Sequence, residues 1–258
     1  MTSPFDGLPE IYDRARPEYP PPLFDALFAM LPPRAMPARA VEVGPGTGQA
    51  TGALLARGAH VTAVEIGANL AAFLARKFAD QPRLIVLNAA FEDAALPEAS
   101  WDLVLSATAY HWVRADTRIT KPHVLLAPGG VLAVIDTIQV RDDADRGYFE
   151  RSHPIYMRYF PQQGPYEVAP APDVDPPILD EMRASGLFED VRVQRWRWDQ
   201  IYNADQYIDL VRSYSNTYDL APDVRERFLE EIRAMVAAEP GGSVVRPLSI
   251  TLATGKRG

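Results

Sequence analysis

The stretch AVEVGPGTGQATGALLARGAHVTAVE, residues 40–65, decides the fold of this chain. It begins as a short apolar run with one acid inside it, and it breaks at glycines 44, 46 and 48. It then continues as a helical pattern that ends at a second apolar run. A strand that turns sharply into a helix before another strand predicts a βαβ unit. Glycines in such a turn let a ligand approach the free backbone N–H groups of the helix N-terminus.

The residues around this loop narrow the class of ligand. The dinucleotide fingerprint needs a third glycine at position 49, where the chain has Gln49, and no Walker A lysine follows the loop. Glu65 ends the second strand, where a carboxylate can accept both hydroxyls of a ribose. Glu42, inside the first strand, would repel a phosphate and attract an ammonium or sulfonium group. S-adenosylmethionine (SAM) is a ribose-bearing cation that fits both acids.

The same alternation of short apolar runs and amphipathic segments continues to residue 137, which indicates a parallel sheet covered by helices. Gly58 and the pair Gly129–Gly130 stand where helix C-caps are expected. The expected strands are residues 39–44, 60–66, 84–91, 101–109 and 130–137.

After residue 138 the pattern changes to a helix, a proline-rich loop and a second helix. A strand over 190–202 and two more helices follow, and a closing strand over 243–257 returns to the sheet. An antiparallel edge strand on an otherwise parallel sheet is a common arrangement.

Composition limits the possible functions. The chain has 258 residues and no cysteine, which excludes disulfides, thiolate nucleophiles and cysteine-based metal sites. The four histidines show no metal-ligand spacing, so we expect no metal. A net charge of −8 disfavours nucleic acid as a partner. Because the sequence shows no signal peptide pattern and no long apolar run, we expect a cytoplasmic protein that does not enter membranes. We expect it to be a monomer or a homodimer.

Four segments in order along the chain resemble the consecutive motifs of class I SAM-dependent methyltransferases. They are VEVGPGTGQAT (41–51), VTAVEIGANL (61–70), FEDAALPEASWDLVLSATAYHWV (91–113) and LLAPGGVLAVID (125–136). The resemblance covers about half of the chain, residues 10–137. YDRARPEYPPPLFDAL (12–27) and AYHW (109–112) resemble the trans-aconitate methyltransferase-like subgroup, which methylates small molecules.

The resemblance implies an α/β fold of the Rossmann-like, doubly wound type. We expect a mostly parallel seven-stranded sheet with an antiparallel C-terminal edge strand and a mostly helical cap. Residues 1–137 would form the N-terminal segment and the SAM-binding core. Residues 138–189 would be a helical cap insertion, and residues 190–258 would return to the sheet with further covering helices, all within one domain.

The resemblance also assigns cofactor-binding roles. The loop would wrap the methionine moiety of SAM, Glu42 would lie beneath it, Glu65 would bind the ribose and Ile66 would pack on the adenine. The loop after the third strand reads NAAFED, which departs from the family's usual acidic GD pattern and leaves Phe91 or Glu92 to contact the adenine amino group. Arg16 would meet the cofactor carboxylate. The loop residues in this prediction are Gly44, Gly46, Thr47 and Gly48.

The methyl acceptor is predicted less directly. His111 follows the fourth strand and is the candidate for a general base or an acceptor-orienting group, or else it is a histidine satisfied by backbone. Arginines concentrate after residue 138, which favours O-methylation of a small acid or polar metabolite, with Arg212 as the anchor. The predicted acceptor pocket consists of Tyr110, His111, Trp112, Trp198, Arg212 and Tyr214.

Two other functions remain open from the sequence. The first is an NAD(P)-dependent oxidoreductase on a similar fold, which Gln49 and the lack of a Tyr-x-x-x-Lys pair disfavour. The second is a protein that binds the cofactor without turnover, which only assays with acceptors can exclude.

Overall fold

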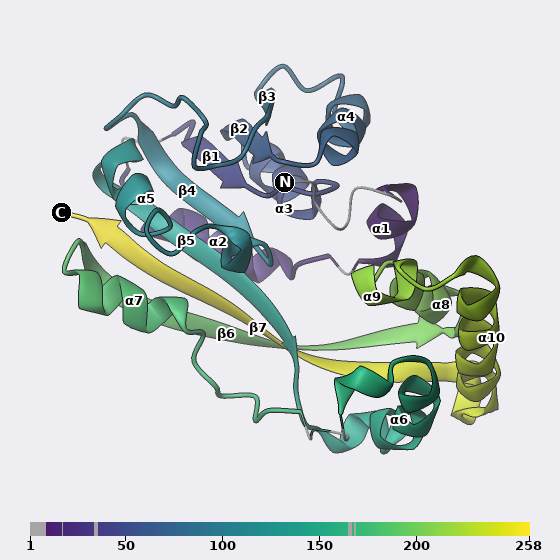
Figure 1. Ribbon diagram of the computed structural model, residues 1–258. Helices are drawn as coiled ribbons and strands as arrows, with labels where there is room; N and C mark the ends of the chain where they lie inside the picture. Colours follow the sequence, from purple (N-terminus) through teal and green to yellow (C-terminus); the bar gives the residue numbers. More distant parts are fainter. Residues whose placement is uncertain (1–8, 17, 34–35, 165–166, 168) are drawn as a thin grey trace.

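The fold is built on one seven-stranded sheet, here taken from a computed structural model that describes residues 9–16, 18–33, 36–164, 167 and 169–258 (Figure 1). The strands lie in the order β3-β2-β1-β4-β5-β7-β6. The first five are parallel, and β7 is antiparallel to both of its neighbours. Their bounds are β1 Arg39–Val43, β2 His60–Glu65, β3 Leu84–Asn88, β4 Trp101–Ala107, β5 Leu126–Gln139, β6 Phe188–Asn203 and β7 Ser243–Arg257.

The predicted fold class is confirmed, and the position of the last strand is now specified. The C-terminal strand β7 is antiparallel, as predicted, but it lies one position in from the edge, which β6 forms. Gly129 and Gly130 do not cap the preceding helix, because that helix ends at Leu125. They lie within β5, at an irregularity of its pairing with β4 where Gly129 has a positive φ of 77°. Gly58 follows the helix that ends at Ala56, with a positive φ of 83°.

The helices are short and lie between or beyond the strands. Their bounds are α1 Pro9–Ala15, α2 Pro21–Met30, α3 Gln49–Ala56, α4 Ala68–Lys77, α5 Thr120–Leu125, α6 Tyr148–Tyr159, α7 Ile178–Ser185, α8 Ala204–Arg212, α9 Ser215–Tyr218 and α10 Pro222–Ala238.

Alternation along the strands creates two hydrophobic layers, one on each face of the sheet. In β1, Ala40 packs into the layer that α2 and α3 cover, whereas Val41 packs into the layer that α5 and α7 cover. Because both faces of β1 and β4 are buried, their sequences are nearly continuous apolar runs. This double cover leaves the carboxyl ends of the strands as the open crevice of the fold.

A third cluster forms the cap at the far end of β6 and β7 (Figure 1). Here α6, α8 and α10 pack together, with Phe228 and Ile232 of α10 fully buried. The predicted insertion 138–189 therefore divides in space: α6 joins the cap, and α7 packs on the sheet. The covering helices predicted within residues 190–258 include α8 and α10, and these two complete the cap.

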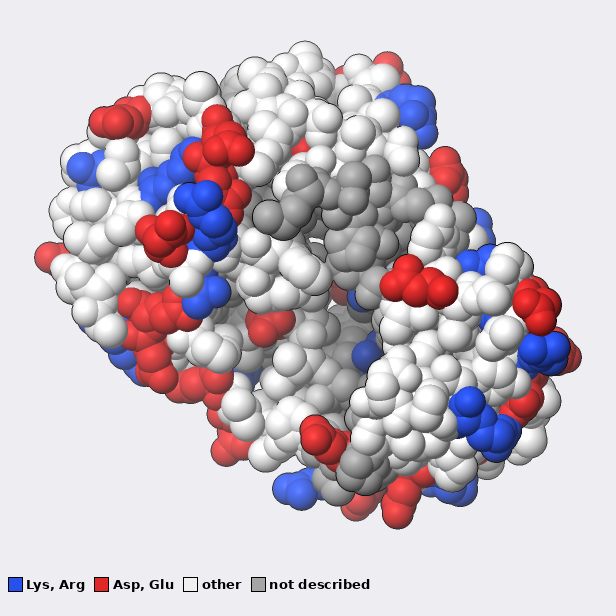
Figure 2. All heavy atoms as spheres, in the orientation of Figure 1, with Lys and Arg blue, Asp and Glu red and all other residues white. Residues whose placement is uncertain are grey.

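The surface carries charges of both signs. On the face shown in Figure 2, lysine and arginine side chains are interspersed with aspartate and glutamate, and the centre of this face is hollowed. Within the described ranges, no helix has the length and apolar character needed to cross a bilayer.

Candidate functional site

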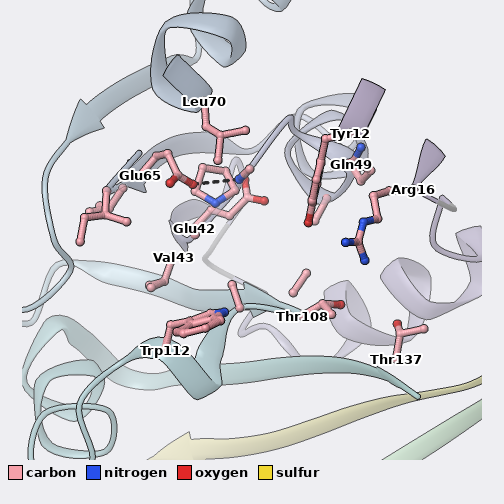
Figure 3. A pocket seen from close by; sticks show the side chains of 18 of the residues that line it. Tyr12, Arg16, Glu42, Val43, Gln49, Glu65, Leu70, Thr108, Trp112 and Thr137 are labelled. Atoms are coloured by element: carbon pink, nitrogen blue, oxygen red, sulfur yellow. Dashed lines mark hydrogen bonds between the residues drawn. The ribbon is translucent and has the colours of Figure 1, made fainter. Parts of the chain in front are cut away.

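A cavity of about 300 Å³ opens at the carboxyl ends of β1, β2 and β4, where the strand order reverses (Figure 3). This is the place where doubly wound sheets bind their ligands. Tyr12 of α1 and Arg16, which directly follows α1, line the cavity. The end of β5 and the start of β7 form the wall that lies toward the cap. Predicted cofactor residues that line the cavity are Arg16, Glu42, Gly44, Gly46, Glu65, Ile66, Phe91 and Glu92.

The three loop glycines all have positive φ angles, but they serve different purposes. A Cβ on Gly44 would lie 2.7 Å from the Ala109 Cβ, and one on Gly48 would lie 2.5 Å from a ring carbon of Phe78. Gly46 also lines the cavity, but it differs because a Cβ there would lie 3.7 Å from its nearest neighbour, a ring carbon of Tyr12. Gly44 and Gly48 therefore permit tight packing of the loop, and Gly46 keeps backbone accessible to a ligand.

Glu65 holds the loop in this shape. Its carboxylate accepts hydrogen bonds from the backbone N–H of Gly46, at 3.0 Å, and from that of Gly67, at 2.8 Å. The residue is 3% exposed, and Asn88 on β3 donates its side-chain amide to the Glu65 carbonyl. Glu65 thus connects the glycine loop to the end of β2 in addition to lining the cavity.

Glu42 is a buried acid beneath the loop, 1% exposed. Its Oε2 accepts a hydrogen bond from the Thr51 hydroxyl on α3, at 2.6 Å. Burial raises the pKa of Glu42 to about 7, because desolvation penalises the carboxylate more than the Thr51 hydrogen bond stabilises it. A cationic ligand beside Glu42 would supply the missing counter-charge.

Thr47 is the predicted loop residue whose side chain does not line the cavity. It is fully buried, and its hydroxyl lies 2.8 Å from the Gln49 amide nitrogen. Gly48 is likewise turned toward α4 and not toward the cavity. Both residues therefore shape the loop from behind.

Comparison with known proteins agrees with this geometry. A family model described as a methyltransferase domain matches residues 41–134. An uncharacterised methyltransferase of Mycobacterium tuberculosis is 29% identical over 240 residues, which cover 93% of this chain and 88% of that protein. The protein is a SAM-dependent methyltransferase.

Solved structures share the fold of this methyltransferase. A protein of Anaeromyxobacter dehalogenans assigned as a type II methyltransferase has a TM-score of 0.64 and 23% identity, over 94% of this chain and 97% of that one. Phosphoethanolamine N-methyltransferase 2 of Haemonchus contortus, solved with SAM, has a TM-score of 0.55 and 12% identity. That likeness covers all of this chain and 60% of the other.

The loop after β3 of the methyltransferase is held by a lysine that sequence reasoning did not single out. The Lys121 ammonium on α5 donates to the carbonyls of Phe91, Glu92 and Ala94, at 2.7, 3.0 and 2.8 Å. The Glu92 carboxylate in turn accepts from the backbone N–H of Arg114, at 2.8 Å. The loop NAAFED, which departs from the family pattern, is thus held by the single ammonium group of Lys121.

The helix α1 is attached to the rest of the site by a second lysine. Lys77, at the end of α4, lies 2.5 Å from the Asp13 carboxylate and donates to the Thr47 carbonyl at 3.1 Å. The Arg16 guanidinium lies over the Tyr12 ring, 4.6 Å from its centroid. Tyr12 thus lies next to Gly46, and Arg16 lies beside Tyr12 at the cavity (Figure 3).

Of the predicted acceptor residues, only Trp112 lines this cavity. Tyr110 is buried in the sheet layer, and its hydroxyl donates to the Arg118 carbonyl. His111 is exposed, with its ring 5.1 Å from that of Trp112. The reason is local: residues 110–112 form a single 3-10 turn, which directs these neighbouring side chains in different directions.

The three predicted residues of the covering segments also lie outside the lining. Trp198 packs against the core layer on β6, where every second side chain faces the sheet's covered side. Arg212 forms a two-pronged ion pair with Glu226 of α10, at 2.7 and 2.9 Å, so its charge is already neutralised. Tyr214 lies behind the wall of the cavity, where its hydroxyl accepts a hydrogen bond from Arg246.

Several lining residues were not predicted from the sequence. They come from positions that are far apart in the chain and that carry no motif, so no local signal could have selected them. Polar members of this set are Thr137, Gln139 and Arg246.

Proposed function

We propose that this methyltransferase transfers the methyl group of SAM to an oxygen atom of a small acid. The observation that carries the proposal is the set of ionisable side chains around the cavity. The described lining includes the guanidinium groups of Arg16 and Arg246 but no histidine or lysine. The carboxylates of the lining, Glu42, Glu65 and Glu92, are the ones proposed for the cofactor. An acceptor that needed a proton removed would therefore lack a base of its own, whereas a carboxylate acceptor is already ionised at neutral pH.

The residues of the cavity fit SAM in several respects. Glu42 is a buried acid that would face the cofactor ammonium, and Arg16 would bind its carboxylate. Gly46 keeps its backbone accessible at a position where a Cβ would enter the cavity. The Glu65 carboxylate accepts from the Gly46 N–H and would also accept from the ribose hydroxyls, because each carboxylate oxygen has two lone pairs. Ile66 would pack on the adenine, next to Phe91 and Glu92.

The chemistry requires alignment more than acid or base catalysis. SAM supplies a methyl group that its sulfonium has already activated. The acceptor oxygen contributes the electron pair of the new C–O bond, the S–C bond breaks with its electrons going to sulfur, and the products are a methyl ester and S-adenosylhomocysteine. No proton moves, so the protein has to orient the acceptor and exclude water. His111, being exposed and outside the lining, has no part in this proposal.

The size and cover of the site support a small acceptor. The helices α1 and α8 both contribute lining residues, so the cavity lies between the sheet and its covering helices. The resemblance to the trans-aconitate methyltransferase-like subgroup supports an acid in the same way. Membership of that subgroup, a cytoplasmic location and a monomeric or homodimeric state stay predictions.

The test is transfer of a labelled methyl group from SAM to a panel of small carboxylic acids, each paired with its amide, with phenols and amines alongside. We expect base-labile methyl esters from one or more acids and no product from the matched amides. Methylation of phenols or amines without ester formation would refute the acid as acceptor. Binding of SAM without any turnover would favour the cofactor-binding alternative.

A further inference from the structure

The end of the cavity nearest the cap carries a second set of polar groups, distant from the predicted adenosine end. Thr137 and Gln139 lie on β5, and Arg246 lies on β7. Gln139 is paired with Leu248, so side chains at 137, 139, 246 and 248 share one face of the sheet. Figure 3 shows Thr137 and Glu65 on opposite sides of the cavity.

Arg246 is a half-buried cation in this group. Its Nε donates to the Gln139 side-chain oxygen at 3.0 Å, and its Nη1 donates to the Tyr214 hydroxyl at 2.6 Å. Both partners are neutral, and within the described ranges no carboxylate pairs with it. A guanidinium has five N–H donors and stays charged at any physiological pH. Arg246 therefore keeps its full charge and further donors at the cavity.

Most of the other described arginines after residue 138 are paired with acids, which makes the contrast informative. Their partners lie on α10, directly after it or in loops, and the pairs are partly exposed, as is usual for surface ion pairs. The pairs are Arg151 with Glu239, Arg158 with Glu231, Arg195 with Asp175, Arg197 with Asp142 and Arg212 with Glu226.

Thr137 supplies an independent observation. Its hydroxyl oxygen is buried, and it has no hydrogen-bond partner among the described residues. Thr137 lines the cavity from the sheet face that it shares with Arg246. Buried hydroxyl groups in proteins are nearly always bonded, so an unpaired one beside a cation indicates that a ligand completes the set.

We propose that Arg246, oriented by Gln139 and Tyr214 and assisted by the Thr137 hydroxyl, binds a carboxylate of the methyl acceptor. This inference rests on the proposed function and names the anchor for its substrate. Leu210 and Leu248 line the cavity and are buried, so the part of the acceptor next to the anchored carboxylate is apolar. Arg16 is left to the cofactor, and the two guanidinium groups serve different ligands.

The test separates acceptor binding from cofactor binding. Calorimetry first measures the affinity of each variant for S-adenosylhomocysteine, and the resulting complex is then titrated with benzoate and hexanoate and with benzamide and hexanamide. The variants are Arg246→Leu, Arg246→Lys and Thr137→Val, with Arg158→Leu as a control that removes a paired arginine in the cap. Circular dichroism confirms that each variant is folded.

We expect at least one acid to bind the wild-type complex more tightly than its amide. Arg246→Leu should weaken that acid about tenfold or more, and Arg246→Lys should recover part of the loss. Thr137→Val should weaken it by a smaller factor, and Arg158→Leu should bind like wild type. Affinity for S-adenosylhomocysteine should stay within about twofold throughout.

Three outcomes would overturn the assignment. In the first, neither acid is preferred to its amide by the wild-type complex. In the second, Arg246→Leu binds the acid as well as wild type does. In the third, Arg246→Leu loses S-adenosylhomocysteine and the acid together, which would give Arg246 to the cofactor. If the wild-type protein binds no S-adenosylhomocysteine at all, the proposed function fails at its first step, which is a different result.

Discussion

At the scale of single residues, Glu42 shows how a fold keeps an acid where solvent does not stabilise its charge. The side chain is buried between β1 and α3 with one hydrogen bond, from Thr51. Burial is the largest cause of its raised pKa, and the nearby Glu65 carboxylate raises the pKa further. The protein thus carries a half-protonated acid near neutral pH at the place proposed for the cofactor ammonium.

This predicts a specific pH dependence of stability. The pKa of Glu42 rises from 4.5 in the unfolded chain to about 7 in the fold, so the folded state binds the proton more tightly. The stability that this proton provides is complete below about pH 4.5 and is lost as the pH rises through 7. As the pH rises over that range, we expect wild type to lose up to about 3 kcal/mol of unfolding free energy relative to Glu42→Gln.

Urea unfolding of both proteins without cofactor, at several values between pH 5 and pH 8, measures this shift. Glu42→Gln is the matched comparison because it keeps the shape and removes the titration. Parallel stability curves for the two proteins would show that the Glu42 pKa is not raised.

Gly46 and Gly48 form a second pair at this scale, since both have positive φ and only one faces the ligand. We expect Gly46→Ala to weaken S-adenosylhomocysteine binding about tenfold or more and to lower the unfolding free energy by about 1 kcal/mol, the cost of the backbone conformation. Gly48→Ala should cost about 1 to 3 kcal/mol more, because its Cβ would meet Phe78 and Leu74 at 2.5 and 2.6 Å. Calorimetry measures the affinity and thermal unfolding measures the stability of each variant. If the two variants lost S-adenosylhomocysteine affinity equally, beyond what their instability explains, the different roles of Gly46 and Gly48 would be contradicted.

At the scale of secondary-structure elements, lysines connect helices to loops around the cavity. Lys77 joins α4 to α1 and to the glycine loop, and Lys121 joins α5 to the loop after β3. Each ammonium donates to backbone carbonyls of a loop, and Lys77 also pairs with the Asp13 carboxylate. The two lysines thereby position opposite sides of the cofactor site.

For Lys77→Met we expect a loss of S-adenosylhomocysteine affinity of about fivefold, near 1 kcal/mol, because α1 loses its contact with the loop. Thermal stability should change little, since the lysine is a third exposed. The neighbouring variant Arg76→Met is the control, because its pair with Glu10 spans 3.9 Å and is mostly exposed on both sides. Hydrogen exchange of residues 9–16 should speed up in Lys77→Met only; unchanged exchange in that segment would rule out the proposed attachment.

At the scale of the whole molecule, the cap and the sheet share their longest strands. Tyr202 of β6 and Val244 of β7 are buried in the cap cluster, while Leu252 and Ile250 of β7 belong to a sheet layer. A strand that passes through two hydrophobic clusters couples them, because separating them would break its ladder. The cap is therefore expected to unfold together with the sheet.

Replacing Ile232 by Ala tests this coupling. Ile232 is fully buried in the cap, so the change should cost about 2 to 5 kcal/mol. None of the four tryptophans belongs to the cap cluster, which makes their fluorescence a probe of the rest of the fold. We expect the fluorescence and far-ultraviolet circular dichroism transitions in urea to shift together. An earlier circular dichroism phase with unshifted fluorescence would mean that the cap unfolds independently.

Elements whose causes are local could be predicted from the sequence. The glycines at 44, 46 and 48, the strand patterns around them and the acids at 42 and 65 all lie within one βαβ half-unit, so spacing was sufficient to predict the sheet and the placement of both acids at its crevice. Residues 243–257 were predicted as a closing strand for the same reason, and β7 spans them.

Contacts between side chains that are distant in the chain could not be predicted in this way. The arginine clustering after residue 138 indicated Arg212, yet that side chain pairs with Glu226 across α8 and α10. Arg246 reaches the cavity because β7 is inserted beside β5, a pairing between residues about a hundred positions apart. Charge, burial and the presence of a partner are properties of such contacts between elements, and alternation along one strand cannot show which cation is left without an acid.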